Sequence, residues 1–404
     1  MESKYDIREF LAGVASGIML LFMLLFVLAC TGIFDIVFLP GNNARTILER
    51  DIRRKTDIIG MYIDRYYFDD IDSETMANSI YKGIFRGLGD NYAEYYTAEE
   101  YKEITEKSNG TYCGIGASVK ENVKTGDIVI VKPIKGGPAQ KAGIEAGDII
   151  CAVDGEIVVG QDLSTVLSKV KGEEGTTVSL MVQRGNEDDY ITIKVKRELI
   201  EEDTVFSKML SGQTGYIKVT GFEEVTKKQF KNAVDTLEDA GMKSLIIDLR
   251  NNGGGLLSAA VTMLDRLLPK GLVVYTKNKS GIEEEFFAED DICLKLPMAI
   301  LVNGGSASAS EVFSGALQDN GVAKLVGTTT FGKGIVQTIF GLEDGTALKM
   351  TTSKYYTPKG RNIHKTGLDP DIEVKLDKDT LADDGEEFAI DNQMQAALDY
   401  LAGN

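Results

Sequence analysis

One serine of this chain lies where a nucleophile could act. The stretch 301–311, LVNGGSASASE, runs from an apolar strand through a glycine turn into a helix. At such a strand-to-helix turn Ser308 would project its hydroxyl over the edge of a sheet, and the helix N-terminus would favour developing negative charge. The letters S-A-S-E also form a capping box, which any helix can use. This stretch alone therefore leaves catalysis and helix capping open.

A lysine between two glycines could supply the base that such a serine needs. In TFGKGIVQT, residues 330–338, Lys333 is surrounded by Gly, Phe and Ile. Burial lowers the pKa of an amine, and a base near neutral pH must lose about 3 units, or roughly 4 kcal/mol. In an extended segment Gln337 would share a face with Lys333 and could orient it through its amide oxygen. A surface lysine is the alternative; a P-loop is excluded, because G-x-x-x-x-G-K-[ST] is absent.

A second glycine turn could stabilise an oxyanion. Residues 248–256 read DLRNNGGGL, so a buried strand again leads through glycines into a helix. Backbone N–H groups exposed at such a turn could bind the oxygen of a tetrahedral intermediate. A dinucleotide-binding turn is excluded because G-x-G-x-x-G is absent, and a purely structural turn is the alternative.

The chain contains a single histidine, His364, in the polar turn RNIHKTG. A Ser-His-Asp triad would have to use this residue, and we expect it to be solvated or hydrogen-bonded instead. The G-N-S-G-G motif of trypsin-like proteases is also missing. Both observations argue against a trypsin-like mechanism.

Strand-like and helix-like stretches alternate over residues 202–376, which contain all these candidates. Such alternation predicts an α/β layered core with a largely parallel sheet. Strands are expected at 215–219, 244–249 and 298–302, and helices at 226–240, 256–267 and 310–318.

Residues 108–198 are rich in Gly and β-branched residues, and they resemble a PDZ domain, β-rich with two helices. The resemblance rests on P-A-x-x-A-G-I-x-x-G-D-x-I-x-x-V-D-G at 138–155. In such domains a peptide adds a strand to the sheet, and N–H groups of a glycine turn hold its terminal carboxylate. The matching turn contains Gly114, Ile115 and Gly116; the alternative is that these glycines merely bend a strand.

Several motifs together resemble the carboxyl-terminal processing protease, or tail-specific protease, family over roughly residues 75–376. They are LGDNY at 88–92, the PDZ run, DLRNN-x-GG, SASASE, FGKG-x-VQ and YYTPKGR at 355–361. The resemblance implies a serine endopeptidase in which Ser308 is the nucleophile, Lys333 the general base and Gln337 its partner. It further implies oxyanion donors at Gly254 and Ala309, peptide or protein substrates gripped by their C-terminal tails, PDZ-gated access, and no metal or other cofactor.

Two positions depart from the family pattern. Gly253 stands where members usually have Pro, which would loosen the turn. Lys171 occupies a place often held by Arg, and a lysine cannot replace a bidentate arginine contact.

The runner-up function is a membrane-anchored PDZ adaptor that has lost catalysis, although Ser308, Lys333 and Gln337 are all present.

The N-terminal region predicts a membrane anchor. After a tail at 1–9, residues 10–34 carry no charge and are long enough to span a bilayer. A cleaved signal peptide, or a lipoprotein signal around Cys30, is the alternative. Basic residues after this span would favour a cytoplasmic catalytic part, so the expected extracytoplasmic location rests on the family resemblance. Residues 43–107 read as a helical arm. This arm could assemble two chains into a homodimer, or it could simply pack against the rest of the chain.

Composition limits the remaining partners. The formal net charge is -18, which makes nucleic acid an unfavourable partner. The four cysteines lack zinc-ligand spacing, so no metal site is expected. Residues 377–404 form an acidic tail with a helix expected at about 391–401.

Overall fold

The computed structural model describes residues 52–122, 124–185, 189–281, 283–290, 293–377 and 390–403. The chain divides into two compact units, Met1–Met76 and Ala77–Asn404. The described part of the first unit holds helix α4 (Arg53–Tyr66), with no buried residue. The predicted anchor at 10–34 lies outside the described residues, and no helix within them is long and apolar enough to cross a bilayer.

The predicted helical arm is only partly helical in its described part. Helix α5 (Ser73–Arg86) is followed by strand β1 (Glu94–Tyr96) and helix α6 (Ala98–Asn109). Strand β1 pairs antiparallel with a strand of the C-terminal half, and its Tyr95 and Tyr96 are buried. Strand β1 follows the break that Gly89, Asp90 and Asn91 make in the helical pattern, and its partner strand lies more than 200 residues away in sequence.

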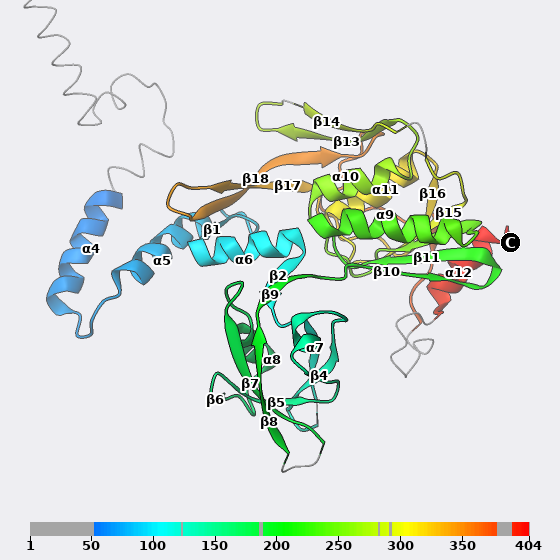
Figure 1. The fold of residues 1–404 in the computed structure, drawn as a ribbon. Helices are drawn as coiled ribbons and strands as arrows, with labels where there is room; N and C mark the ends of the chain where they lie inside the picture. The colour runs from blue at the N-terminus through cyan, green and yellow to red at the C-terminus, as the bar shows by residue number, and fades with distance from the viewer. Residues whose placement is uncertain are drawn as a thin grey trace, which may run out of the picture. The chain divides into compact units, whose positions relative to one another are not determined.

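The PDZ segment forms a small antiparallel sheet with two helices, shown below α6 in Figure 1. Its strands follow the order β3-β4-β5-β7-β8, with β6 beside β5, and a separate pair, β2 and β9, joins the two ends of the segment. The elements are β2 (Thr111–Gly114), β3 (Ala117–Glu121), β4 (Ile128–Pro133), α7 (Pro138–Lys141), β5 (Ile149–Val153), β6 (Glu156–Ile157), α8 (Leu163–Val170), β7 (Thr177–Gln183), β8 (Tyr190–Lys196) and β9 (Glu198–Glu201). Strand β3 is an edge strand, which leaves room for an added peptide strand.

The predicted α/β core is confirmed as a six-stranded sheet of order β10-β11-β12-β15-β16-β19. All neighbours from β11 onward are parallel, and β10 is antiparallel. Its elements are β10 (Val205–Met209), a short 3-10 turn η2 (Ser211–Gln213), β11 (Thr214–Val219), α9 (Glu224–Asp239), β12 (Ser244–Asp248), α10 (Leu257–Asp265), β15 (Met298–Val302), α11 (Ala309–Asp319), β16 (Ala323–Gly327) and β19 (Ile372–Glu373).

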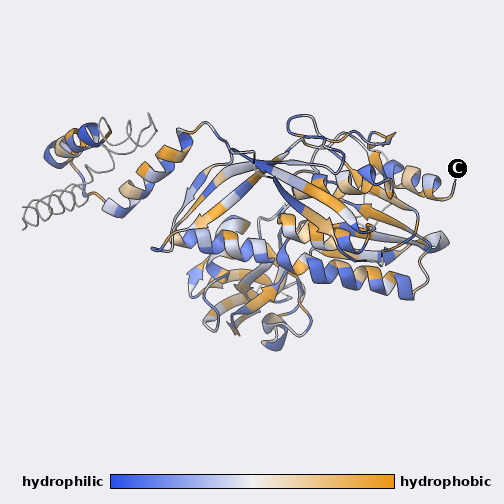
Figure 2. Ribbon diagram, turned by 90° about the horizontal axis from the view of Figure 1, so that it is seen from above, coloured by the Kyte–Doolittle hydropathy of each residue, from blue (hydrophilic) through white to orange (hydrophobic). Residues whose placement is uncertain are grey.

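Alternate residues of the central strands face opposite sides of this sheet. Ile247 and Ile300 pack under α9, α10 and α11, whereas Ile246 and Leu301 pack under the C-terminal helix α12 (Asn392–Leu401). Strands of the core appear largely orange in Figure 2, and the helices mix orange with blue, as amphipathic helices do. The sheet is therefore buried on both faces, which fixes the turns at its strand ends.

A second, antiparallel sheet lies beside the core. Strands follow the order β1-β18-β13-β14, and β17 pairs with β18. The new elements are β13 (Gly271–Asn278), β14 (Glu283–Ala288), β17 (Ile335–Gly341) and β18 (Ala347–Tyr356). This sheet carries the predicted base, because β17 begins two residues after Lys333.

Candidate active site

Ser308 occupies a strained turn between β15 and α11. Its φ is 57° and its ψ is -114°, a region that residues with a side chain rarely adopt. The turn is held from below, because Ser306 Oγ donates to Leu249 O at 2.8 Å and Ser310 Oγ donates to Asn252 O at 2.8 Å. The strain is thus supported by a buried framework, and such support is typical of functional turns.

A buried carboxylate joins this turn to the loop of Lys333. Glu311 is fully buried in the first turn of α11. One of its oxygens accepts from the N–H groups of Ser308 and Lys333 at 2.9 and 2.8 Å. The other accepts from Thr330 Oγ1 at 2.6 Å and Gly332 N at 2.8 Å. The capping-box interpretation of S-A-S-E is therefore incomplete, since the same carboxylate also fixes the second loop.

Lys333 is half-buried, and its surroundings disfavour the charged form of its amine. Burial lowers the pKa of its amine below the usual value, and nearby Lys349 adds to this, while Glu311 opposes it. Its Nζ lies 4.7 Å from the ring centroid of Tyr92. Both Ser308 and Lys333 are described, and no hydrogen bond joins Ser308 Oγ to Lys333 Nζ in this structure. The two groups share a site without being in proton-transfer contact.

Gln337 lies on β17 beside the same site. The pairing of β17 with β18 shifts register between Val336 and Gln337, so simple alternation does not describe this strand. The amide Nε2 of Gln337 donates to Thr351 Oγ1 at 3.4 Å, which orients the side chain. The expected contact of its amide oxygen with Lys333 stays a prediction.

The second glycine turn lies directly against Ser308. A Cβ placed on Gly254 would come within 2.7 Å of Ala307 O and 2.9 Å of both Ala309 N and Ser308 Cβ. The φ of Gly254 is 103°, so glycine is needed for conformation as well as for space. The Gly254 N–H donates to Asn252 Oδ1 at 2.9 Å, so this predicted oxyanion donor is engaged within its own turn.

Substitution of this glycine should affect activity selectively. In Gly254→Ala the added Cβ would clash with Ala307 O and Ala309 N and displace the N–H of this turn, so we expect kcat/KM for peptide cleavage to fall by roughly 10²-fold, as when one oxyanion donor is lost. Gly253→Ala is the matched control, because a Cβ there meets nothing within 4 Å. Steady-state kinetics of the two variants, with circular dichroism to verify folding, test this; equal activities would remove Gly254 from the site.

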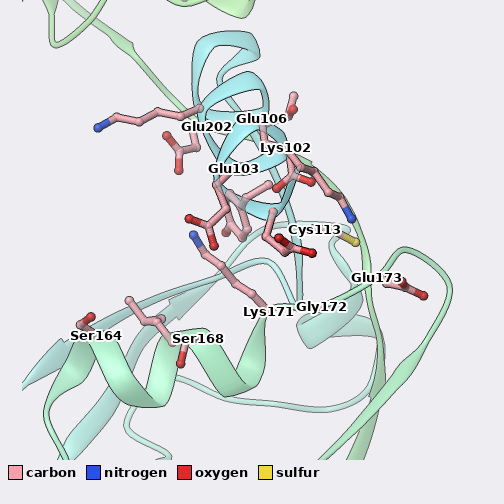
Figure 3. A pocket seen from close by; sticks show the side chains of 15 residues that line it. Lys102, Glu103, Glu106, Cys113, Ser164, Ser168, Lys171, Gly172, Glu173 and Glu202 are labelled. Carbon is pink, nitrogen blue, oxygen red and sulfur yellow. The ribbon is translucent and has the colours of Figure 1, made fainter. Parts of the chain in front are cut away.

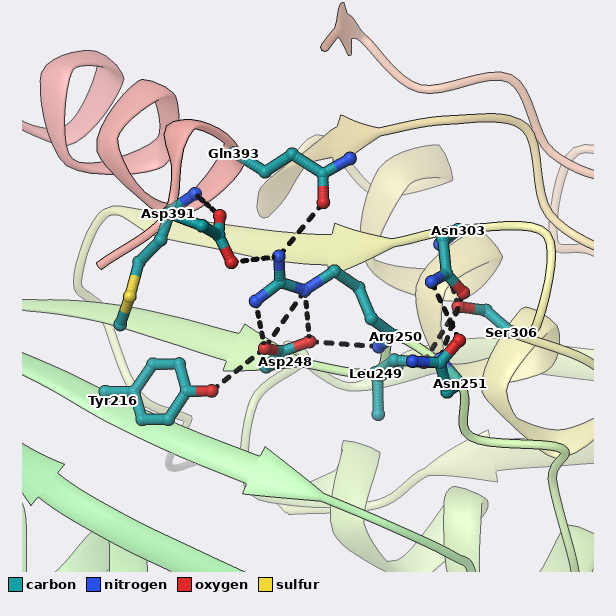
Figure 4. Close-up of polar contacts among 10 residues, drawn as sticks. Tyr216, Asp248, Leu249, Arg250, Asn251, Asn303, Ser306, Asp391 and Gln393 are labelled. Atoms are coloured by element: carbon teal, nitrogen blue, oxygen red, sulfur yellow. Dashed lines mark hydrogen bonds and ion pairs between the residues drawn. The ribbon is translucent and has the colours of Figure 1, made fainter. Parts of the chain in front are cut away.

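An ion-pair network anchors the glycine turn from the opposite side (Figure 4). Arg250 Nη2 donates to Asp248 Oδ2 at 2.7 Å, and Arg250 Nη1 donates to Asp391 Oδ2 at 2.6 Å and Gln393 Oε1 at 3.0 Å. The Tyr216 hydroxyl donates to the same Asp248 oxygen at 2.9 Å. The predicted C-terminal helix is thus joined to the DLRNN turn, a connection that the acidic composition of the tail did not indicate.

All the predicted catalytic and oxyanion residues line one cavity of about 630 Å³. Ser308, Lys333, Gln337, Gly254 and Ala309 all line it. Sequence reasoning missed other lining residues: Lys107 from α6, Glu223 before α9, and Lys349 and Tyr355 from β18. Burial raises the pKa of the Glu223 carboxyl, and the Tyr355 hydroxyl donates to Ser308 O at 3.1 Å. The stretch YYTPKGR carried a signal for Tyr355, whereas nothing in the sequence pointed to Lys107 or Glu223.

The predicted peptide-binding turn of the PDZ segment is compact. Gly114, Ile115 and Gly116 are all buried, and Gly116 has a φ of 68°. The carbonyls of Ile115 and Gly116 accept from Ala139 N at 2.7 Å and Ile134 N at 2.9 Å. The turn is therefore a rigid element, and its role in binding a carboxylate stays a prediction.

A second cavity of about 740 Å³ lies between α6 and α8 (Figure 3). Lys171 lines it, with its Nζ 5.0 Å from the ring centroid of Tyr112. A buried arginine lies close by in the same segment: Arg197 donates to Val170 O at 2.8 Å and to Lys169 O at 3.0 Å. These two hydrogen bonds tie the end of the PDZ segment to the C-terminus of α8.

The remaining polar candidates lie away from the cavity. The backbone of His364 packs against Gly334, where a Cβ would come within 2.5 Å of His364 N, and His364 does not line the cavity. Cys113, Cys151 and Cys293 are free thiols. Among the described residues, no group of three or more His, Cys, Asp or Glu side chains could hold a metal ion.

Comparisons with known proteins agree with this arrangement. A family model for peptidase family S41 matches residues 213–374, and a PDZ domain model matches residues 113–195. The chain is 38% identical over 311 residues to the carboxy-terminal processing protease CtpA of Bacillus subtilis, covering 77% of this chain and 66% of that protein. It is 40% identical over 316 residues to a probable CtpA-like serine protease of Staphylococcus aureus (strain COL), covering 77% of this chain and 62% of that protein.

The chain thus spans slightly less than two thirds of the length of these two relatives. Among solved structures, a protein described as an S41 protease from Bacteroides fragilis aligns with a TM-score of 0.52. The alignment covers 84% of this chain and 98% of that chain at 16% identity, which is a likeness of fold. With the S41 model over the α/β core, the PDZ model before it and these relatives along most of the sequence, the chain belongs to the family of PDZ-containing carboxyl-terminal processing serine proteases.

Proposed function

We propose that this chain is a serine endopeptidase that cuts proteins held near their C-terminal tails, with Ser308 as nucleophile and Lys333 as general base. One observation carries the proposal: a strained serine and a half-buried lysine of lowered pKa line the same cavity. A cavity of about 630 Å³ is large enough for several side chains of an extended peptide.

The reaction would proceed in two stages. Neutral Lys333 takes the proton of Ser308 Oγ while that oxygen bonds to the scissile carbonyl carbon. The resulting ammonium then gives its proton to the leaving amine, the C–N bond breaks, and an acyl-enzyme ester remains. Water attacks this ester, Lys333 again accepts and returns a proton, and the free carboxylic acid leaves with Ser308 restored.

Backbone groups near Ser308 would stabilise the tetrahedral oxyanion. Ala309 begins α11, so its N–H is one of the orphan donors of a helix N-terminus and faces Gly254. The Gly254 N–H would have to exchange Asn252 Oδ1 for the oxyanion. Gln337 would orient the neutral amine of Lys333 from β17.

Other parts of the chain would deliver the substrate. In this proposal Gly114, Ile115 and Gly116 bind the terminal carboxylate of a peptide that extends edge strand β3, and PDZ movement gates the cavity. Residues 10–34 would anchor the protein in the membrane with the catalytic part outside the cytoplasm. A homodimer would use the helical arm, where the side chains of Met61 and Tyr62 on α4 are 64% and 61% exposed.

A covalent probe tests the nucleophile directly. A fluorophosphonate is expected to modify Ser308 in the full-length membrane-inserted chain, with the adduct mapped by peptide mass spectrometry. Labelling should disappear in Ser308→Ala and fall strongly in Lys333→Ala, because the serine then lacks its base. Cleavage of a flexible peptide with an apolar C-terminus should follow the same order.

The opposite outcome identifies the adaptor alternative. Tail binding without labelling or cleavage would mean that the chain holds peptides and does not hydrolyse them. Adducts on a serine outside the cavity, with unchanged cleavage by Ser308→Ala, would place the chemistry elsewhere.

A further inference from the structure

An aromatic ring from the N-terminal half faces the proposed base. Tyr92 lies just before β1, and its ring centroid is 4.7 Å from Lys333 Nζ. The segment is fixed at two points: Tyr92 N donates to Asp90 Oδ1 at 2.9 Å, and β1 pairs with β18. The ring is therefore held at a defined position beside Lys333.

We propose that Tyr92 is a positioning residue that holds the protonated Lys333 ammonium against its ring, away from Ser308, and releases the neutral amine toward the serine. This inference rests on the proposed function, in which Lys333 is the base. A cation is attracted by the negative face of an aromatic ring, whereas a neutral amine is not. The position of the side chain would then follow its protonation state.

Besides the ring, the charges of Lys349 and Glu311 act on the amine of Lys333. Among the described residues, no carboxylate lies within ion-pair distance of Lys333 Nζ. The carboxylate of Glu311 is used by the N–H groups of the two loops, including that of Lys333 itself. Lys349 on β18 repels the ammonium, and it is itself engaged by Tyr96 and, at 3.3 Å, by Glu94.

Two further charged groups line the cavity. Lys107 of α6 and Glu223 before α9 line the same cavity, with opposite charges. The Tyr355 hydroxyl is occupied by Ser308 O at 3.1 Å. Burial and Lys349 therefore favour the neutral amine, and Glu311 and the ring of Tyr92 favour the charged one. The balance sets the pH at which Lys333 leaves the ring and becomes a base.

The test compares the pH dependence of cleavage by full-length Tyr92→Leu and Tyr92→Phe. Leucine removes the ring, so the pKa of Lys333 should fall and the acidic limb of kcat/KM should move to lower pH by roughly half a unit. Phenylalanine keeps the ring face, and its profile should coincide with that of the unchanged chain. Coincident profiles for all three proteins, or an equal shift in both variants, would overturn the role of the ring.

A second measurement reads Lys333 without using activity. Lysines carrying ¹³C at the ε position are titrated by NMR in a Ser308→Ala background, with the Lys333 signal assigned by Lys333→Arg. The titration midpoint should fall with Tyr92→Leu and not with Tyr92→Phe. If this holds but Lys333→Ala still cleaves peptides, the proposed function fails while the ring contact stands; an unmoved midpoint overturns the contact itself.

Discussion

Alanine at Ser308 and alanine at Lys333 are each expected to lower kcat/KM for cleavage of a flexible tail by about 10⁴-fold or more, with no further loss in the double variant. In the proposed mechanism the two side chains act on one proton, so removal of either one ends the same step. Initial rates with a fluorogenic peptide, measured for the two single variants and the double variant, give the comparison.

Matched controls exist for both positions. Ser314 is on α11 as well, and its Oγ is buried without a hydrogen-bond partner in the described part of the chain, so Ser314→Ala should retain activity. Lys354 is exposed on β18, and Lys354→Ala should also be active. Strictly additive losses in the double variant would mean that Ser308 and Lys333 act in separate steps.

The pH dependence of the unchanged chain has a defined sign. Only the neutral amine of Lys333 can accept the serine proton, and its pKa is lowered mainly by burial and then by Lys349. Cleavage should therefore rise with pH up to that pKa and then level off, with the half-maximum below the value of an ordinary lysine.

Much of the catalytic core could be predicted from sequence because its signals are local. Strands such as Ser244–Asp248 and Met298–Val302 are short buried apolar runs, each followed by a glycine turn. Parallel strands end at the same edge of a sheet, so the turns that hold Gly254 and Ser308 meet there.

What sequence reasoning missed depends on contacts between distant segments. Tyr92 reaches Lys333 only because β1 pairs with β18, and three tyrosines and a glutamate around β1 look like ordinary arm residues in the sequence. Asp391 was expected to begin a helix, and it does cap α12, but its ion pair with Arg250 joins residues 141 positions apart. No periodicity or local motif records such a pairing.

Glu311 shows how one motif can have two functions. The sequence S-A-S-E correctly indicated a helix N-terminus, and the carboxylate does accept the Ser308 N–H. Three further donors come from residues 330–333, and a local pattern cannot contain them. The residue that joins the loops of the proposed nucleophile and the proposed base was therefore visible only in its capping role.

Removal of the Glu311 side chain is expected to damage both activity and stability. In Glu311→Ala, three N–H groups and the Thr330 hydroxyl lose their acceptor in a fully buried position. One unsatisfied buried donor costs about 1–3 kcal/mol, so a loss of roughly 3 kcal/mol or more in the unfolding free energy of the core is expected even with relaxation. The loops of Ser308 and Lys333 should separate, lowering kcat/KM by at least about 10³-fold.

Two further variants separate charge from structure. Glu311→Gln keeps one acceptor oxygen but turns an amide NH₂ toward N–H donors, so it should be more stable than Glu311→Ala and still nearly inactive. Glu224→Gln changes an exposed glutamate in the first turn of α9 and should behave like the unchanged chain. Thermal unfolding and peptide cleavage are measured together on all three. Native-like cleavage by Glu311→Gln would mean that the negative charge is dispensable, and that the hydrogen bonds accepted by one remaining oxygen suffice to align Ser308 with Lys333.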